Sequence, residues 1–318
     1  MVTKVAVLGP AGFGGSYVVN ELLNRGSYDV VGISRNPGKI GKHDRYTPHA
    51  LDITNATIAE LIEAFKSVDV VINAFNPPYG PNVYTETFVE TVRRIVIAAK
   101  HSNLQYFLTI GGTGSLYLRD PATSYETAAD SRPFWLAYRR ATADSEAATY
   151  HMEERIGFGS PMSRSMRAYR SARQSLLSNP GSLTAANRKV IDETEKMVTE
   201  GPDPIPDIPI AARATYMFFE GNTTFPWSFV SPPAKYIPGP RTAKYEVHID
   251  RVPLAPESER TKGSENEFDG RLLGISVADL AVAIVDEVEK REKIGKHWSA
   301  VAELPGEHER HASYARLS

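Results

Sequence analysis

Three glycines near the start of the chain have a spacing that can hold a phosphate group. Gly9, Gly12 and Gly15 follow the apolar run Lys4–Leu8 and lead directly into a helical pattern. Glycines let the backbone approach a diphosphate, and the unpaired N–H groups at a helix start hold its negative charge. The alternative is a glycine-rich turn in an ordinary strand–helix unit. Because both flanks and the N-terminal position fit, we predict a diphosphate-binding turn. Its residues are Gly9, Ala11, Gly12, Phe13, Gly14 and Gly15.

The residues after the second predicted strand, Asp29–Ile33, bear on the choice of cofactor. An NAD-binding protein usually has an acidic side chain there, which accepts a hydrogen bond from the ribose 2′-hydroxyl. This chain has Ser34-Arg35-Asn36 instead. A guanidinium suits a 2′-phosphate, so Arg35 favours NADP(H) over NAD. A solvated loop charge is the alternative for Arg35.

Further candidates follow the next predicted strands. Asp52 ends the short strand His49–Ile53, where its carboxylate either accepts from the adenine amino group or serves as a turn or N-cap residue. The apolar run Val68–Ala74 is typical of a central parallel strand. Asn73, Ala74 and Phe75 stand at its end, and the loop of residues 76–81 is expected to border the cofactor.

The predicted fifth strand, Leu104–Ile110, runs into Gly111-Gly112-Thr113-Gly114-Ser115. A glycine run that ends in a hydroxyl residue fits a site where a substrate carbonyl approaches the cofactor. It also fits an ordinary turn.

Together these motifs resemble those of atypical short-chain dehydrogenases/reductases. The most similar branch comprises the flavin reductase/biliverdin-IX-beta reductase-like and NmrA-like NAD(P)-binding proteins. Trp227–Ala234 and the segments 238–245 and 274–281 also resemble that branch. The resemblance covers about residues 1–120 and 222–302. It implies a Rossmann-type doubly wound parallel sheet and cofactor contacts that extend to Gly111, Gly112, Ser231 and Pro232.

The resemblance also directs attention to a proton donor. Short-chain reductases usually protonate the substrate oxygen with a tyrosine assisted by a lysine four residues later, and a serine orients the carbonyl. Here Tyr138 is followed by Arg139, and Thr142 stands where the lysine is expected. We predict Ser115 and Tyr138 as catalytic residues. Tyr216 or water is the alternative donor.

Residues from about 121 to 221 form extra material between the fifth and sixth strands. Their pattern predicts helices over Pro133–Glu154, around Met166 and Tyr169, around Ile191, and over Ala211–Phe219. A proline-rich connector spans residues 202–209. The arginines of the second helix recur every three residues, so they spiral around it and cannot all face one ligand. They are Arg164, Arg167, Arg170 and Arg173.

The composition excludes several classes of function. The 318 residues carry a net charge of −2, which gives no electrostatic footprint for nucleic acid or a membrane surface. Cysteine is absent, which excludes disulfides and thiolate catalysis. We find no apolar run of spanning length and no metal-ligand spacing. We expect a cytoplasmic protein with a small-molecule substrate and no metal, and nothing in the sequence supports a homo-oligomer.

Four segments are therefore expected: an NADP-binding core (1–120), a helical insertion (121–221), the completion of the sheet (222–302) and a polar, mobile tail (303–318). The function that the sequence favours is an NADP(H)-dependent oxidoreductase acting on a small aromatic or conjugated molecule. A non-catalytic, NmrA-like redox-sensing regulator and an NADP(H)-bound isomerase or cyclase without net redox stay open as alternatives.

Overall fold

The computed structural model describes residues 2–77, 83–201, 207–259 and 261–317. The strands are β1 (Thr3–Leu8), β2 (Tyr28–Ser34), β3 (Tyr46–Ala50), β4 (Val70–Asn73), β5 (Tyr106–Ile110), β6 (Trp227–Val230), β7 (Lys235–Ile237), β8 (Glu246–Ile249), β9 (Gly274–Ser276) and β10 (Lys296–Val301). The α-helices are α1 (Phe13–Arg25), α2 (Ile58–Phe65), α3 (Val89–Lys100), α4 (Arg132–Asp144), α5 (Glu146–Ile156), α6 (Pro161–Ser178), α7 (Ala185–Glu200), α8 (Asp207–Tyr216) and α9 (Val277–Lys290). Short 3₁₀ turns include η1 (Pro37–Ile40) and η3 (Thr113–Ser115), and η2 (Val83–Phe88) is a π-helix.

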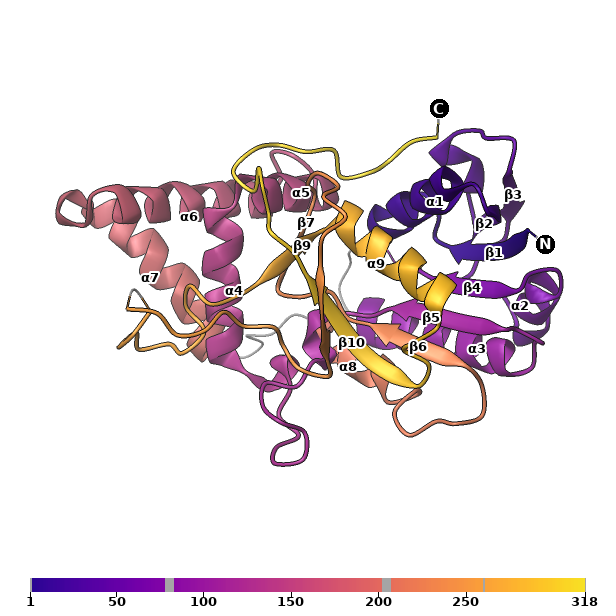
Figure 1. The fold of residues 1–318 in the computed structure, drawn as a ribbon. Coiled ribbons are helices and arrows are strands. Elements are labelled where there is room, and N and C mark those ends of the chain that lie inside the picture. Colours follow the sequence, from indigo (N-terminus) through magenta and orange to yellow (C-terminus); the bar gives the residue numbers. More distant parts are fainter. Residues whose placement is uncertain (1, 78–82, 202–206, 260, 318) are drawn as a thin grey trace.

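A mostly parallel sheet organises the chain (Figure 1). Its strand order is β3-β2-β1-β4-β5-β6-β10-β8, and only the edge pair β10–β8 is antiparallel. The chain leaves β1 toward one edge and returns through β4 toward the other, which is the doubly wound order. The predicted Rossmann-type fold, with helices between β5 and β6, is confirmed.

Helices cover both faces of the sheet because the central strands are apolar on both sides. Val5 and Val7 pack under α1 and α9, whereas Ala6 and Leu8 face the core beneath α2, α3 and α8. Parallel strands buried in this way read as continuous apolar runs, which is why the sequence revealed them. The carboxyl ends of β1, β4, β5 and β6 meet at one edge.

The insertion departs from its predicted outline. Residues 133–154, expected as one helix, are two helices, because the Ser145 side chain accepts a hydrogen bond from Ala148 N and caps α5. Helices α6 and α7 project away from the sheet as a hairpin (Figure 1). The third strand lies at Tyr46–Ala50 rather than at residues 49–53. Residues 202–206 of the proline-rich connector lie outside the described part.

The tail is docked along the molecule, which corrects the expectation that it is mobile. Tyr17 Oη donates to the carbonyl of Ala312 at 2.6 Å, and Ala315 N donates to Ser16 Oγ at 3.1 Å. Leu317 N donates to the carbonyl of Ile40 at 2.8 Å. The tail therefore runs beside the first turn of α1 to η1, and most of these contacts use backbone atoms that leave no trace in the sequence (Figure 1). In the described ranges, no helix has the length and apolar character needed to cross a bilayer.

The junction of β5 and β6 gives a test of this packing. A Cβ on Gly111 would lie 2.0 Å from the Phe229 ring, so Gly111→Ala should lower the free energy of unfolding by about 1–3 kcal/mol. Gly38→Ala is the matched control, because no atom lies within 4 Å of its added Cβ. Urea unfolding of both variants measures the difference. Equal stability of the two would contradict the packing of β6 against Gly111.

Candidate functional site

The glycine turn has the geometry that a diphosphate needs. Gly9 has a φ of +76°, and a Cβ on Gly15 would lie 2.1 Å from the Gly9 carbonyl oxygen. Gly12 is the N-cap of α1, with no side-chain hydrogen bond to cap the helix and no acidic residue in the first turn. Gly12 N donates to the carbonyl of Gly9 at 3.1 Å, and the N–H groups that follow it at the start of α1 are left to an anion. These residues fit the diphosphate of a dinucleotide.

At the end of β2 the structure places Arg35 on the surface beside η1. The last residues of the tail lie against the same turn, where Arg316 donates to the carbonyl of Lys39. Asp52 accepts from Thr54 N at 3.2 Å and from Asn55 Nδ2 at 2.8 Å, so its carboxylate shapes a turn. The N-cap of α2 is Thr57 instead.

The end of β4 is tied to its neighbours. The Asn73 side chain is buried, donates to Thr109 Oγ1 at 2.9 Å and accepts from Phe75 N at 3.2 Å. Ala74 and Phe75 remain partly exposed at the edge beside Gly9. Asn73 therefore holds the edge in place, whereas Ala74 and Phe75 are free to border a ligand. Residues 78–81 of the loop expected to border the cofactor lie outside the described part.

The segments after β5 and β6 are packed against protein, which speaks against several predicted ligand contacts. Gly111 faces the Phe229 ring, and a Cβ on Gly112 would lie 3.0 Å from Ala212. Pro232 is buried, and its carbonyl accepts from Thr113 Oγ1 at 2.9 Å. These glycines are explained by close packing of β6 and α8.

Ser115 is fully buried, and its hydroxyl is engaged with protein atoms. It donates to the carbonyl of Gly112 at 2.9 Å and lies 2.7 Å from Ser231 Oγ. His297 Nε2 lies 3.2 Å from Ser115 Oγ and 2.9 Å from Ser231 Oγ. The proposed orientation of a substrate by Ser115 is thus at odds with this structure. Ser231 is equally inaccessible to a cofactor.

The sequence gave no sign that His297 joins Ser115, since 182 positions separate them. Asp250 Oδ1 lies 3.6 Å from His297 Nδ1, so the set has the composition of a hydrolase triad. Both serines are 0% exposed, however, and the pKa of His297 is lowered to about 3 by burial. A nucleophile must reach its substrate, so we interpret this set as a structural network between β6, β10 and η3.

Tyr216 is buried beneath the sheet and does not line the small cavity that Tyr138 lines. Helix α8 leads from the end of β5 to the start of β6, so its first residues lie at that edge, and a Cβ on Gly114 would contact Pro209. Tyr216 is the last residue of α8, roughly 13 Å further along the helix axis. Its ring lies 4.1 Å from the ring of His297, centroid to centroid. This position disfavours Tyr216 as a proton donor.

Tyr138 lines a small cavity next to the glycine turn, which we call the Tyr138 cavity. The cavity is lined by Tyr138, Ala141, Thr142, Ser145, Ala148, His151, Met152, Ala234, Lys235, Tyr236 and Ile237. Phe13 of the turn lies between two of these rings, with centroids 4.0 Å from His151 and 4.8 Å from Tyr236. A Cβ on Gly14 would lie 3.1 Å from Tyr236 Oη. The cavity thus adjoins the place that the glycines prepare for a dinucleotide.

Three residues of this cavity were missed by the sequence analysis: His151, Lys235 and Tyr236. Lys235 supplies a cation to the cavity of Tyr138 and pairs with Glu307 at 3.0 Å. Strand β7 thus contributes a lysine to the lining of the cavity that Tyr138 also lines. A signal existed, because Lys235 and Tyr236 directly follow Pro232-Pro233-Ala234, the segment already assigned to the site.

His151 and Tyr236 of the cavity are neutral at physiological pH. Burial, with a contribution from Arg155, lowers the pKa of His151 to about 3, and its Nδ1 lies 3.0 Å from Ser313 Oγ of the tail. Burial raises the pKa of Tyr236 above its ordinary value. The cavity therefore offers neutral hydroxyl donors and one lysine. In the described ranges, no group of three or more His, Asp or Glu side chains could hold a metal ion.

Comparison with known proteins agrees with this geometry. Residues 5–157, which contain the glycine turn, Arg35 and Tyr138, match the model of the NAD dependent epimerase/dehydratase family. The match covers slightly less than half of the chain and shows a likeness to that family. The predicted kinship with NAD(P)-binding reductases is thereby confirmed at the level of this broad family, and a nicotinamide dinucleotide is its cofactor class.

One curated relative, the uncharacterized protein YwnB of Bacillus subtilis, is 29% identical over 122 residues. The match spans 38% of this chain and about half (53%) of that relative.

Solved structures extend the likeness over nearly the whole chain. A presumed epimerase from Bacteroides thetaiotaomicron has a TM-score of 0.58 at 22% identity and covers 95% of this chain and 97% of its own. A presumed NADH-flavin reductase from Streptococcus pneumoniae has a TM-score of 0.57 at 19% identity, with coverage of 95% and 100%. The oxidoreductase ylbE from Lactococcus lactis has a TM-score of 0.54 at 12% identity, with coverage of 98% and 93%. At these identities the likeness shows the fold.

The two buried histidines predict how stability depends on pH. His151 and His297 both have a pKa of about 3 in the folded chain, so the unfolded chain takes up their protons first as the pH falls. Their contribution is complete above about pH 6.5 and is lost toward pH 3. Between pH 7 and pH 5 each histidine should cost about 2 kcal/mol of stability.

Urea unfolding at pH 7, 6 and 5 measures this loss. His297→Gln should remove about half of the histidine-dependent part, because glutamine does not titrate. His101→Gln, at an exposed position, is the control and should leave the pH dependence unchanged. An unchanged pH dependence in His297→Gln would show that His297 is not buried in its neutral form.

Proposed function

We propose that the protein is an NADP(H)-dependent oxidoreductase whose substrate, a small aromatic or conjugated molecule, is bound next to the Tyr138 cavity. The observation that carries the proposal is the contact of Phe13 in the glycine turn with His151 and Tyr236, two rings of that cavity. It joins the expected diphosphate position to a cavity whose lining includes both a tyrosine and a lysine.

Different residues bind the cofactor, donate the proton and shape the substrate site. The glycine turn and the start of α1 hold the diphosphate, and Arg35 binds the 2′-phosphate. The bound cofactor supplies a hydride. Tyr138 donates a proton to the substrate oxygen, and Lys235 provides the positive field that makes its hydroxyl a better donor. The rings of Phe13, His151 and Tyr236 shield the reacting atoms from water and favour a flat, conjugated substrate.

The size of the cavity supports a second candidate function. Its volume is about 30 Å³, which holds water but no aromatic ring, so a substrate must displace side chains in order to enter. The small volume of the cavity and the absence of a lysine at position 142 favour a non-catalytic NADP-binding regulator. Such a protein would bind a partner differently in its NADP and NADPH states.

Arg35 gives a direct test of cofactor choice. Arg35→Ala should raise the Kd for NADPH on the order of tenfold, because a charge-assisted hydrogen bond to the 2′-phosphate is lost, and should leave the Kd for NADH unchanged. Arg93→Ala, an exposed arginine paired with Glu90 on α3, is the control. Calorimetric titration measures both constants. Wild-type protein that binds NADH as tightly as NADPH would refute the NADP preference.

Measurements of turnover distinguish the oxidoreductase from the non-catalytic regulator. NADPH consumption is followed with flavins, quinones and conjugated ketones as acceptors. Tyr138→Phe should lower kcat for ketones on the order of a hundredfold and spare acceptors that need no protein acid, whereas Tyr125→Phe, 74% exposed, should change neither. Tight NADPH binding without turnover of any acceptor would favour the regulator. A product formed while NADP(H) stays unchanged would instead indicate an isomerase.

A further inference from the structure

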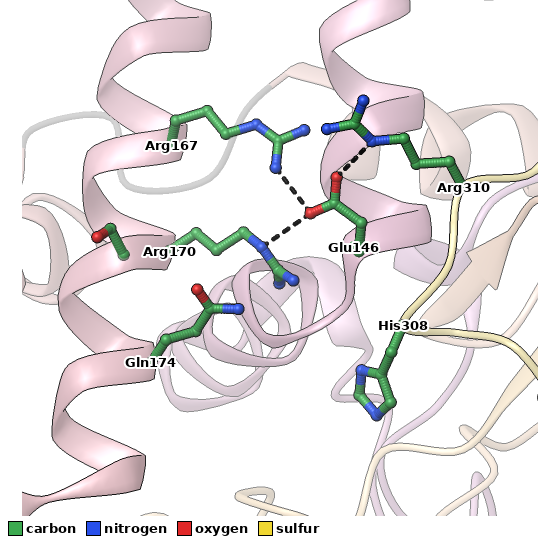
Figure 2. Close-up of a pocket in the computed structure, with 7 residues that line it drawn as sticks. Glu146, Arg167, Arg170, Gln174, His308 and Arg310 are labelled. Atoms are coloured by element: carbon green, nitrogen blue, oxygen red, sulfur yellow. Dashed lines mark hydrogen bonds and ion pairs between the residues drawn. The ribbon is translucent and has the colours of Figure 1, made fainter.

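A second, larger cavity lies between α5, α6 and the tail (Figure 2). It has a volume of about 480 Å³ and is lined by Glu146, Arg167, Arg170, Ser171, Gln174, His308 and Arg310. Glu146 begins α5, and His151, which faces Phe13, lies about 140° around the helix from it. The cavity therefore faces away from the glycine turn and is separate from the site described above.

One carboxylate anchors three guanidinium groups at the back of this cavity (Figure 2). Glu146 lies 2.7 Å from Arg167 Nη1, 3.0 Å from Arg170 Nε and 2.9 Å from Arg310 Nε. Burial alone would raise the pKa of Glu146, but hydrogen bonds from Arg167 and Arg310 outweigh it and keep the carboxyl ionised. The guanidinium groups are thus held in place without any ligand.

The lining of this cavity carries an excess of positive charge. Arg167 also pairs with Glu153, so three guanidinium groups face two carboxylates. Arg170 pairs with Glu146 through Nε and donates from Nη1 to the carbonyl of Ala143. Arg310 donates from Nε to Glu146. Among the described residues, Nη2 of Arg170 and both Nη atoms of Arg310 have no hydrogen-bond acceptor, which leaves these donors for a ligand.

Two further polar side chains extend the lining of the cavity on both sides. Gln174 lies one turn after Arg170 on the same face of α6, and its amide points toward the cavity (Figure 2). His308 lies across from it on the tail. The other two arginines of α6 are directed elsewhere, since Arg164 donates to the carbonyl of Gly159 and Arg173 pairs with Asp144. Only part of the arginine series faces this cavity, in keeping with its spiral spacing.

We propose that this cavity binds a small organic anion through its phosphate or carboxylate groups. Guanidinium groups recognise such oxyanions through charge-assisted hydrogen bonds. The cavity is open to solvent, and its volume exceeds what a single inorganic ion fills. The binding does not depend on the proposed oxidoreductase activity.

Calorimetric titration with inorganic phosphate, glucose 6-phosphate and citrate tests the proposal and separates the two oxyanions. At least one organic anion should bind saturably and more tightly than inorganic phosphate. Arg310→Gln should raise its Kd at least fivefold, and Gln174→Glu, which places a negative charge in the wall, should abolish binding. Arg310 is 63% exposed at its side chain and Gln174 is exposed, so both variants should fold.

Two controls locate the bound anion. Arg164→Gln, on the same helix but outside the cavity, and Arg35→Ala, at the dinucleotide edge, should leave the Kd unchanged. The proposal is overturned if no organic anion saturates the protein. It is equally overturned if Arg35→Ala abolishes binding and Arg310→Gln does not, because the anion then occupies the dinucleotide edge.

Discussion

The site depends on the close approach of two backbone segments at the glycine turn. A Cβ on Gly15 would lie 2.1 Å from the Gly9 carbonyl oxygen, and one on Gly9 would lie 2.9 Å from the Ala74 carbonyl oxygen. Helix α1 can therefore begin directly over the end of β1, and β4 can end beside it. Asn73 then ties the end of β4 to Thr109 on β5. One steric constraint thus fixes three strand ends and the amides that face a diphosphate.

The insertion and the tail supply residues of the two cavities that the sheet and its helices do not supply. Helix α5 brings His151 onto Phe13, and the tail brings Ser313 onto His151. Lys235 of β7 pairs with Glu307 of the tail, while Ser145 at the start of α5 donates to the carbonyl of Glu307. The Tyr138 cavity and the arginine-lined cavity therefore lie on two sides of α5, and the tail borders both. Sequence segments more than 150 positions apart meet there.

The sequence predicted correctly the features that depend on residues close together in the chain. The strand, turn and helix around Gly9–Gly15 follow from apolar runs and glycine spacing, and the central strands follow from their burial on both faces. The role of Ser115 could not be predicted, because its partners Ser231 and His297 come from strands far along the chain. Nor could the docking of the tail, whose backbone groups and side chains pair with residues far away in the sequence. Lys235 shows the same limit, because this lysine of the cavity that Tyr138 lines comes from a distant strand instead of the same helix.

The central claim is that a nicotinamide dinucleotide lies across the glycine turn with its reactive end at the Tyr138 cavity. A crystal structure of the complex with NADPH tests this most directly. The account predicts the diphosphate on the amides that follow Gly12, the 2′-phosphate at Arg35, and the nicotinamide ring beside Phe13 and Tyr236, within reach of Tyr138. A dinucleotide bound elsewhere, or one whose nicotinamide end points away from Tyr236, would contradict it.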